Sequence, residues 1–402
     1  MAVVPALGLT IALVPAGAAS AALARPARPA ITSAAKVAAG EARPGHVAVS
    51  QGAAGQAAAR VPAGTVASPP SIPVGSGPVS NGTLLKFPIS DKVSLQVNVG
   101  SGDALVTTSD ITIPEQGTSL TLGTSYNSLL TGSGVAQGAE GYGWRQREGV
   151  DVQLYPASSD GSVTLLGEGG TAGKFTKPAS GNTYGSPAVF HGTLSNAPTS
   201  TCSGSAYQLT WHQAGEVMCF TSAGLLTSEA DRNGNTTAYA YNGSGQETSI
   251  AYKPAGDSSA VETVTASYTG SYLTGLSQSG GSLGTRTITY TVNASTGNLT
   301  SVKQADGTTV SFGYDSSHDL TSIENGASLT TTVGYNSAHQ VTSVTQPTTG
   351  TSTATTRLDY VSSTETQVAT PDTTQSDLCR PKIGFWRVTC AISDIRRLAR
   401  TR

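Results

Sequence analysis

The chain has 402 residues, a net charge of −2 and only 12% charged residues. With so little charge, and no basic face within its repeats, it gives no electrostatic reason to bind nucleic acid. The abundance of Gly, Ser and Thr favours many short strands and turns over charged helices, so we expect an all-β protein.

The N-terminal segment has the composition of an export signal followed by a linker. Residues 1–24 are apolar and end in small residues, which resembles the core and cleavage site of a secretory signal without its usual positive start. The segment is interrupted by Pro5 and Pro15 and is too short to span a membrane. Residues 25–90 are rich in Ala, Pro and Gly, which is typical of a disordered linker. We therefore predict a secreted or cell-surface protein that is peripheral to a membrane at most; the alternative is an apolar tail that is not cleaved.

Residues 91–220 form the next region, which we call the lead-in. Apolar and polar residues alternate at 120–122, 152–154 and 163–165, which predicts half-buried strands. Trp144 and Trp211 have no neighbouring polar cluster, so we expect them to pack in the core. Cys202 and Cys219 flank the two strands of an apparent hairpin, which predicts a disulfide in an oxidising compartment, with free buried thiols as the alternative.

A short unit recurs between residues 221 and 347. Its clearest copies are 224–242 and 297–315, where an alternating segment, an Asn-Gly or Asp-Gly turn and a second alternating segment follow one another. Such dipeptides predict β-hairpins, because tight hairpin turns need positive φ. A tyrosine recurs every 21 to 27 residues or so, a period typical of stacked repeats. The predicted anchors of the unit are Gly224, Asp231, Gly234, Tyr241, Tyr268, Tyr290, Gly297, Gly307, Tyr314, Asp315 and Tyr335.

The unit resembles that of the bacterial RHS, or YD-repeat, proteins, whose approximate form is G-x-L-x-x-v-x-D-x-x-G-x-x-x-x-y-x-Y-D-x-x-G-x-L-x-x-I. Residues 224–250 match most anchor positions, whereas two later copies carry His318 and His339 where the unit has Gly. The segment from about residue 95 also resembles the region that precedes the repeats in actinobacterial members. The resemblance implies a spiral of β-hairpins, an open fragment of the hollow β-shell in which longer relatives enclose a C-terminal toxin. With about five units and no recognisable release motif or toxin domain, we expect a truncated, non-enzymatic scaffold.

The C-terminal end departs from the repeat pattern. Residues 348–376 are a Thr/Ser-rich stretch that we interpret as a connector, and residues 377–402 form an anomalous basic tail. Three explanations of the tail stay open: a frameshift or gene-fragment end, a short basic helix that binds an anionic partner, or the start of a variable C-terminal module.

Candidate catalytic residues are few. Asp231, Asp306 and Asp315 lie at turn positions, where Asp bonds to the local backbone. The sequence contains no Ser/His/Asp motif, no Gly-x-Ser-x-Gly in a strand-to-helix context and no His-x-x-x-His or Cys-x-x-Cys metal spacing, so we predict no catalytic residue, no metal and no cofactor. The alternative function is a carbohydrate-binding or adhesive module, in which Tyr239, Tyr241 and Tyr314 contact cell-wall glycan. The expected partners are such a glycan or a complementary RHS polypeptide.

Overall fold

The structure is a computed structural model, and it describes residues 83–113, 120–131, 137–147, 149, 151–157, 159–187, 190–279, 284–348, 350–362, 365–371, 378–382 and 387–391. These residues all belong to one structural unit, Ala57–Arg402. The signal-like segment 1–24, most of the predicted linker and residues 392–402 of the tail lie outside the described residues. Within the described ranges, no helix is long and apolar enough to cross a bilayer.

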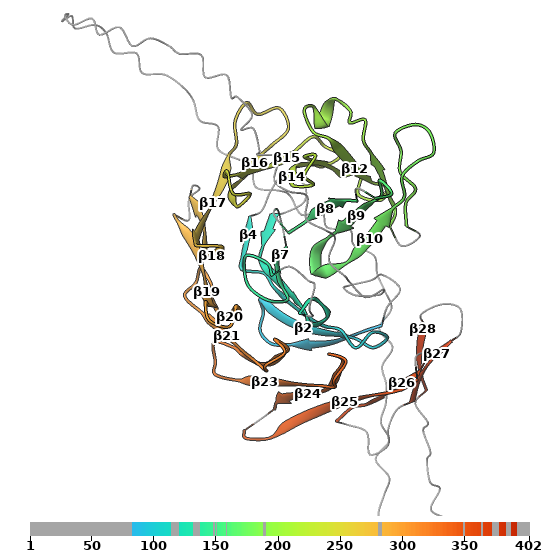
Figure 1. Ribbon diagram of the computed structural model, residues 1–402. Helices are drawn as coiled ribbons and strands as arrows, with labels where there is room; N and C mark the ends of the chain where they lie inside the picture. The colour runs from blue at the N-terminus through green and yellow to red at the C-terminus, as the bar shows by residue number, and fades with distance from the viewer. Residues whose placement is uncertain are drawn as a thin grey trace, which may run out of the picture. The chain divides into compact units, whose positions relative to one another are not determined.

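A 16-stranded antiparallel sheet dominates the fold, and each of its strands pairs with its neighbours in chain order (Figure 1). This arrangement confirms the predicted all-β fold of successive hairpins. The sheet begins within the predicted lead-in and continues through residues 353–369, so the segment that we interpreted as a connector is a further hairpin of the sheet. Its strands are β11 (Gly192–Ser195), β12 (Tyr207–Trp211), β13 (Val217–Phe220), β14 (Leu226–Ala230), β15 (Thr236–Tyr241), β16 (Glu247–Lys253), β17 (Glu262–Thr269), β18 (Tyr272–Ser279), β19 (Arg286–Asn293), β20 (Asn298–Lys303), β21 (Thr309–Tyr314), β22 (Leu320–Glu324), β23 (Thr330–Tyr335), β24 (Val341–Pro347), β25 (Thr353–Ser362) and β26 (Glu365–Ala369).

The lead-in forms smaller antiparallel sheets. Five strands pair in the order β1-β2-β3-β6-β7, three in the order β10-β9-β8, and β4 pairs with β5. The first of these strands lies within residues 25–90, so the linker that we predicted to reach residue 90 ends before residue 84. The elements are β1 (Leu84–Pro88), β2 (Val93–Asn98), β3 (Ala104–Thr108), β4 (Ile111–Ile113), β5 (Leu120–Leu122), β6 (Thr124–Asn127), β7 (Trp144–Gln146), β8 (Gln153–Pro156), β9 (Val163–Leu166), β10 (Ala172–Phe175) and the 3₁₀ turns η1 (Ser128–Leu130), η2 (Glu168–Gly170) and η3 (Ser200–Cys202).

Part of the basic tail also forms strands. β27 (Leu378–Lys382) pairs with β28 (Arg387–Ala391) in an antiparallel hairpin. Residues 378–382 and 387–391 are therefore extended and not helical.

Several hairpins of the repeats close through three-residue turns, including those that contain Asn233-Gly234 and Asp306-Gly307. At the first turn the Asp231 amide donates to the Asn235 carbonyl, and the Gly234 amide donates back to the Asp231 carbonyl. Gly234 has a φ of 87°, the left-handed conformation that ends this type of turn with a bulge. The Asp231 carboxylate accepts hydrogen bonds from the Asn233 and Asn235 amides, at 2.8 and 2.9 Å. Asn242, Asp315, Asn325 and Asn336 begin turns of the same kind, which explains the Asp or Asn at these positions. Gln304 begins the turn that contains Asp306 and Gly307.

The recurrent tyrosine connects one repeat to the previous one. The hydroxyl group of Tyr314 donates to the Leu299 carbonyl at 2.7 Å, and Tyr335 donates to the Leu320 carbonyl at 3.0 Å. Tyr241 and Tyr360 make the equivalent bonds to Leu226 and Val341. The sequence analysis did not identify Tyr360, because it lies in the segment taken for a connector.

One predicted tyrosine anchor is misplaced. At each anchor the strand has a bulge, so that Tyr314 opposes Leu320 and Tyr335 opposes Val341. In β19 the residue at this position is Val292, which opposes Leu299, whereas Tyr290 lies two residues earlier and opposes Val302. Tyr290 is therefore a core residue of the strand and not a repeat anchor.

Candidate functional site

The lead-in bonds directly to a row of backbone groups that the repeats leave unpaired at their turns. We call the Gly224, Gly297, His318 and His339 carbonyls, with the Leu273, Leu320 and Val341 amides, the docking row. These groups lie next to the strand bulges, and a bulge leaves residues unpaired in the ladder. Because buried backbone groups need hydrogen-bond partners, the docking row requires a complementary surface.

The lead-in supplies those partners in register. The hydroxyl group of Tyr126 accepts from the Leu320 amide and donates to the His318 carbonyl, both at 3.0 Å. The Tyr142 amide donates to the Gly297 carbonyl at 3.0 Å, and the Val341 amide donates to the Gly102 carbonyl at 2.8 Å. The remaining groups meet the Ala139 carbonyl, the Leu154 amide and the Ser128 hydroxyl. The hydrogen bonds of the docking row are therefore completed by lead-in residues that are distant in the sequence.

Aromatic side chains fill the space behind these bonds. Trp144 is fully buried, its ring centroid lies 4.7 Å from that of Phe312, and its indole N–H donates to the Tyr314 hydroxyl at 2.7 Å. Tyr126 packs against the other side, at a centroid distance of 5.4 Å from Trp144. Lead-in and repeats therefore share one hydrophobic core.

The two histidines that replace Gly in the turns are structural. His318 and His339 have φ values of 66° and 60°, which confirms that they occupy a left-handed position. His318 stacks on Tyr142 at a centroid distance of 3.9 Å, and its Nδ1 lies 2.8 Å from the Asn298 side-chain oxygen. His339 makes the equivalent contact with Asp319 at 2.8 Å. Both are half-buried, because the lead-in covers this row.

The position equivalent to the core leucine of the repeat is occupied by a carboxylate in one copy. Glu247 opposes Tyr241 as Leu320 opposes Tyr314, yet it is completely buried. The Gln146 amide nitrogen donates to Glu247 Oε1 at 3.1 Å. A carboxylate at an apolar core position breaks the repeat rule, and such departures mark places that need an explanation.

A second carboxyl group, that of Glu140, is buried in the same region and is influenced by the charge of Glu247. Glu140 is also fully buried, and the Thr124 hydroxyl donates to its Oε2. Burial is the main cause that raises the pKa of Glu140 well above its usual value, and the charge of Asp151 adds to this effect. Its Oε1 has no hydrogen-bond partner within the described part of the chain, and the same holds for the hydroxyl groups of Tyr268 and Tyr290.

Two carboxyl groups occur in the active sites of some hydrolases, but Glu140 and Glu247 are not accessible to a substrate. Paired carboxyl groups with separated pKa values can provide general acid and base catalysis. Glu140 and Glu247 are both 0% exposed, so no substrate reaches them in this structure. A search of the described ranges for groups of three or more His, Cys, Asp or Glu that could hold a metal ion finds none.

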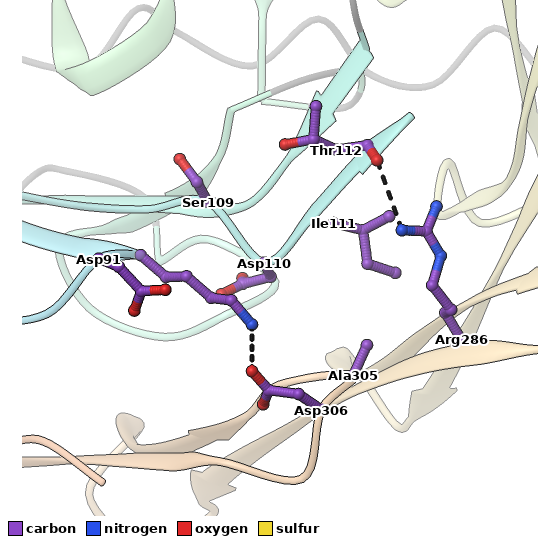
Figure 2. Close-up of a pocket in the computed structure, with 9 residues that line it drawn as sticks. Asp91, Ser109, Asp110, Ile111, Thr112, Arg286, Ala305 and Asp306 are labelled. Carbon is purple, nitrogen blue, oxygen red and sulfur yellow. Dashed lines mark hydrogen bonds and ion pairs between the residues drawn. The ribbon is translucent and has the colours of Figure 1, made fainter. Parts of the chain in front are cut away.

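An open cleft lies between the lead-in and the repeats (Figure 2). It has a volume of about 570 Å³, and its lining residues come from the turn between β1 and β2, the β3–β4 corner, the start of β19 and the turn between β20 and β21. Lys92 and Asp306 form an ion pair across it, which lowers the pKa of Asp306 to about 2. Arg286 bonds to the Thr112 carbonyl at 3.4 Å. The other lining residues are Asp91, Ser109, Asp110, Ile111 and Ala305.

The structure places the remaining predicted site residues as follows. Cys202 and Cys219 form a disulfide that ties η3 to β13. Tyr239 and Tyr241 are buried, and their hydroxyl groups bond to Glu229 and the Leu226 carbonyl. The Tyr314 hydroxyl accepts a hydrogen bond from the Trp144 indole N–H and donates one to the Leu299 carbonyl. These three tyrosines belong to the core, so the predicted glycan contacts are corrected: buried ring faces cannot stack on a sugar.

Sequence reasoning missed both the carboxyl pair and the cleft. Glu247 could have been found, because aligning the repeats places an acidic residue where the other copies have Leu or Val. Nothing local distinguishes Glu140, Arg286 or Asp91, since their roles depend on which segments meet in the fold.

Comparisons with known proteins support the repeat assignment. A family model described as RHS Repeat matches residues 220–258 and 295–328. No curated protein matches the chain.

Solved structures of Tc toxin components are also similar. The chain has 15% identity, a TM-score of 0.35 and 74% coverage with a crystal structure of TcdB2-TccC3 without its hypervariable C-terminal region. With a Tc holotoxin pore of Photorhabdus luminescens that carries a TccC3 mutation, the identity is 14%, the TM-score is 0.33 and 71% of this chain is covered. The chain covers 16% of the matched chain in both structures.

Proposed function

Because this chain carries RHS repeats at residues 220–258 and 295–328, we propose that it acts as a non-enzymatic scaffold at the cell surface or in the secreted fraction, a relative of RHS toxin shells. Its partners are a complementary RHS polypeptide or cell-wall glycan, and nucleic acid is not among them.

The observation that carries this proposal is the sealed interior. The docking row bonds to the lead-in, the carboxyl pair Glu140 and Glu247 is fully buried, and one core joins the two regions. Within the described residues these contacts use the interior for packing, which leaves the outer faces and the open cleft to partners. The repeats therefore serve as structural support.

The disulfide supports export. Cys202 and Cys219 bond across a hairpin, and structural disulfides persist in oxidising compartments. In a reducing cytosol the same pair would be kept as thiols.

A hydrolysis assay tests the non-enzymatic part of the proposal. The purified chain is incubated with peptidoglycan, chromogenic glycosides and a peptide library, and we expect no turnover above a boiled control. Turnover that disappears in the Glu140→Gln and Glu247→Gln variants would overturn the proposal, because it would show that the buried pair becomes accessible and acts as an acid and base.

Fractionation of the producing cells tests the location. We expect the chain in the wall and medium fractions, with Cys202 and Cys219 resistant to alkylation until a reductant is added. Recovery in the cytosol with both thiols reactive would contradict export.

A further inference from the structure

The open cleft of Figure 2 has features that the scaffold role does not use. Its volume of about 570 Å³ lies within the usual range for small-molecule sites, roughly 300–1,000 Å³. It contains two cationic side chains, Lys92 and Arg286, and three carboxyl groups. The arrangement of these charges is what points to a ligand.

Arg286 is held in place with part of its guanidinium group unused. Its Nε donates to the Gln278 side-chain oxygen at 2.6 Å. Gln278 is buried and is itself fixed by a 2.8 Å bond to Glu262. One terminal nitrogen makes the 3.4 Å bond to the Thr112 carbonyl, which is long for an N–H···O hydrogen bond. A guanidinium group that is fixed through Nε is prepared to bind a planar anion such as a carboxylate.

The carboxyl groups of the cleft come from both of its walls: Asp91 and Asp110 from the lead-in, and Asp306 from the same sheet as Arg286. Figure 2 shows Asp91 on the turn between β1 and β2 and Arg286 on the opposite wall, at β19. Asp91 is exposed, and Asp306 forms an ion pair with Lys92. Asp110 is buried, and it accepts hydrogen bonds from Thr108 at 2.7 Å and Gln304 at 3.1 Å. The unpaired charges of the cleft are therefore one carboxylate, Asp91, and one guanidinium group, Arg286.

Two apolar residues, Ala305 and Ile111, line the cleft beside Ser109 and Thr112, and Ile111 is only 2% exposed. Such a surface fits a short aliphatic chain whose two ends carry opposite charges.

We propose that this cleft binds a short zwitterionic peptide, with its carboxylate on Arg286, its ammonium group on Asp91 and its small side chains against Ile111 and Ala305. The site goes beyond the scaffold role and does not depend on it. A chain that fails to bind such a peptide can still be a scaffold.

A ligand-observed NMR titration of the full chain with L-alanyl-L-alanine tests the proposal. We expect saturable binding, and we expect the C-terminal amide and the N-acetylated form of the same dipeptide each to bind more weakly. A charge-assisted hydrogen bond to Arg286 predicts a loss of at least about tenfold for the amide.

Variants of the chain locate the binding. Arg286→Gln is expected to weaken binding by about tenfold and Asp91→Asn by about threefold, because the second charge is exposed. Arg232→Gln is the matched control: its guanidinium group bonds to the Gln213 and Ala214 carbonyls at a turn outside the cleft, so affinity should not change.

Three results would overturn the proposal. They are no saturable binding up to about 10 mM dipeptide, a concentration that would detect even millimolar affinity; equal affinity for the blocked dipeptides; or unchanged affinity in Arg286→Gln. The blocked ligands keep the test valid even where a variant folds poorly, because they use the unaltered chain.

Discussion

The repeats and the lead-in are both built from antiparallel strands, yet they obtain their stability in different ways. In the repeats each strand pairs with the next, and most of the described turns close within a few residues. In the lead-in the decisive side chains bond to partners far away: Trp144 bonds across 170 residues and Tyr126 across 192. Local periodicity therefore forms the sheet, whereas a few long-range polar contacts position the lead-in on it.

The largest effect should come from the tryptophan that joins the two regions. Trp144→Ala removes a fully buried ring and its hydrogen bond to Tyr314, and we expect the free energy of unfolding to fall by about 3–5 kcal/mol in urea titrations. Trp211→Ala is the control, because Trp211 is half-buried and packs mainly on Phe190. Equal losses in the two variants would contradict a special role for the lead-in contact.

The hydroxyl group of Tyr126 gives the next test. Tyr126→Phe leaves the Leu320 amide and the His318 carbonyl without partners, and we expect a loss of about 2–3 kcal/mol because both groups are buried. Tyr272→Phe removes a hydroxyl group that contacts only the exposed Gln137 side chain, so its effect should stay within about 0.5 kcal/mol. A loss below 1 kcal/mol for Tyr126→Phe would show that water replaces its bonds.

The buried carboxyl group predicts a pH dependence with a defined sign. Burial raises the folded-state pKa of Glu140, so the unfolded chain loses this proton first as the pH rises. The contribution of Glu140 to stability is therefore fully retained below the unfolded pKa of about 4.3 and declines as the pH rises towards the folded value. Glu140→Gln should be nearly neutral at pH 4 and stabilising at pH 8, by on the order of 1 kcal/mol.

Chemical denaturation at a series of pH values measures this difference. The charged groups near Glu140 are Asp110, Asp151 and Glu247, with Arg145 paired to Asp151 at 3.4 Å, and they are unchanged in the variant. The control Glu324→Gln alters an exposed carboxylate on β22 and should leave the profile as it is. A Glu140→Gln profile parallel to that of the parent chain would contradict a raised pKa.

The smallest expected effect is the difference in stability change between an exposed turn, at Ser328, and a turn that contacts the lead-in, at His318. Ser328 has a φ of 57° in an exposed turn, so Ser328→Gly should relieve backbone strain and raise stability by about 0.5 kcal/mol. His318→Gly relieves the same strain but loses the Tyr142 stack and the Asn298 contact, and it should cost about 1 kcal/mol. Thermal unfolding of both variants shows whether contacts with the lead-in turn the gain in stability into a loss.

The same contrast explains which parts of the molecule could be predicted. Alternating residues and Asp-x-x-Gly turns repeat in the sequence, so the hairpins between Leu226 and Pro347 were predictable without any partner. The register at Val292 was not, because a tyrosine two residues away matched the pattern better. Glu140, Arg286 and Asp91 carry no local signature, and only the docking of distant strands gives them a role.

One long-range hydrogen bond of the lead-in affects when the chain can complete its fold during synthesis. The Gln340 side chain donates to the Ser101 carbonyl, 239 residues earlier, and the neighbouring Val341 amide bonds to Gly102. At about 5–20 residues per second, a ribosome needs roughly 12–48 s to make the residues between these two points. During that interval the first strands exist without the surface that completes them. A chaperone or secretion factor that holds the nascent chain would therefore act before the last repeat emerges, and the order of translation becomes part of how this protein reaches its fold.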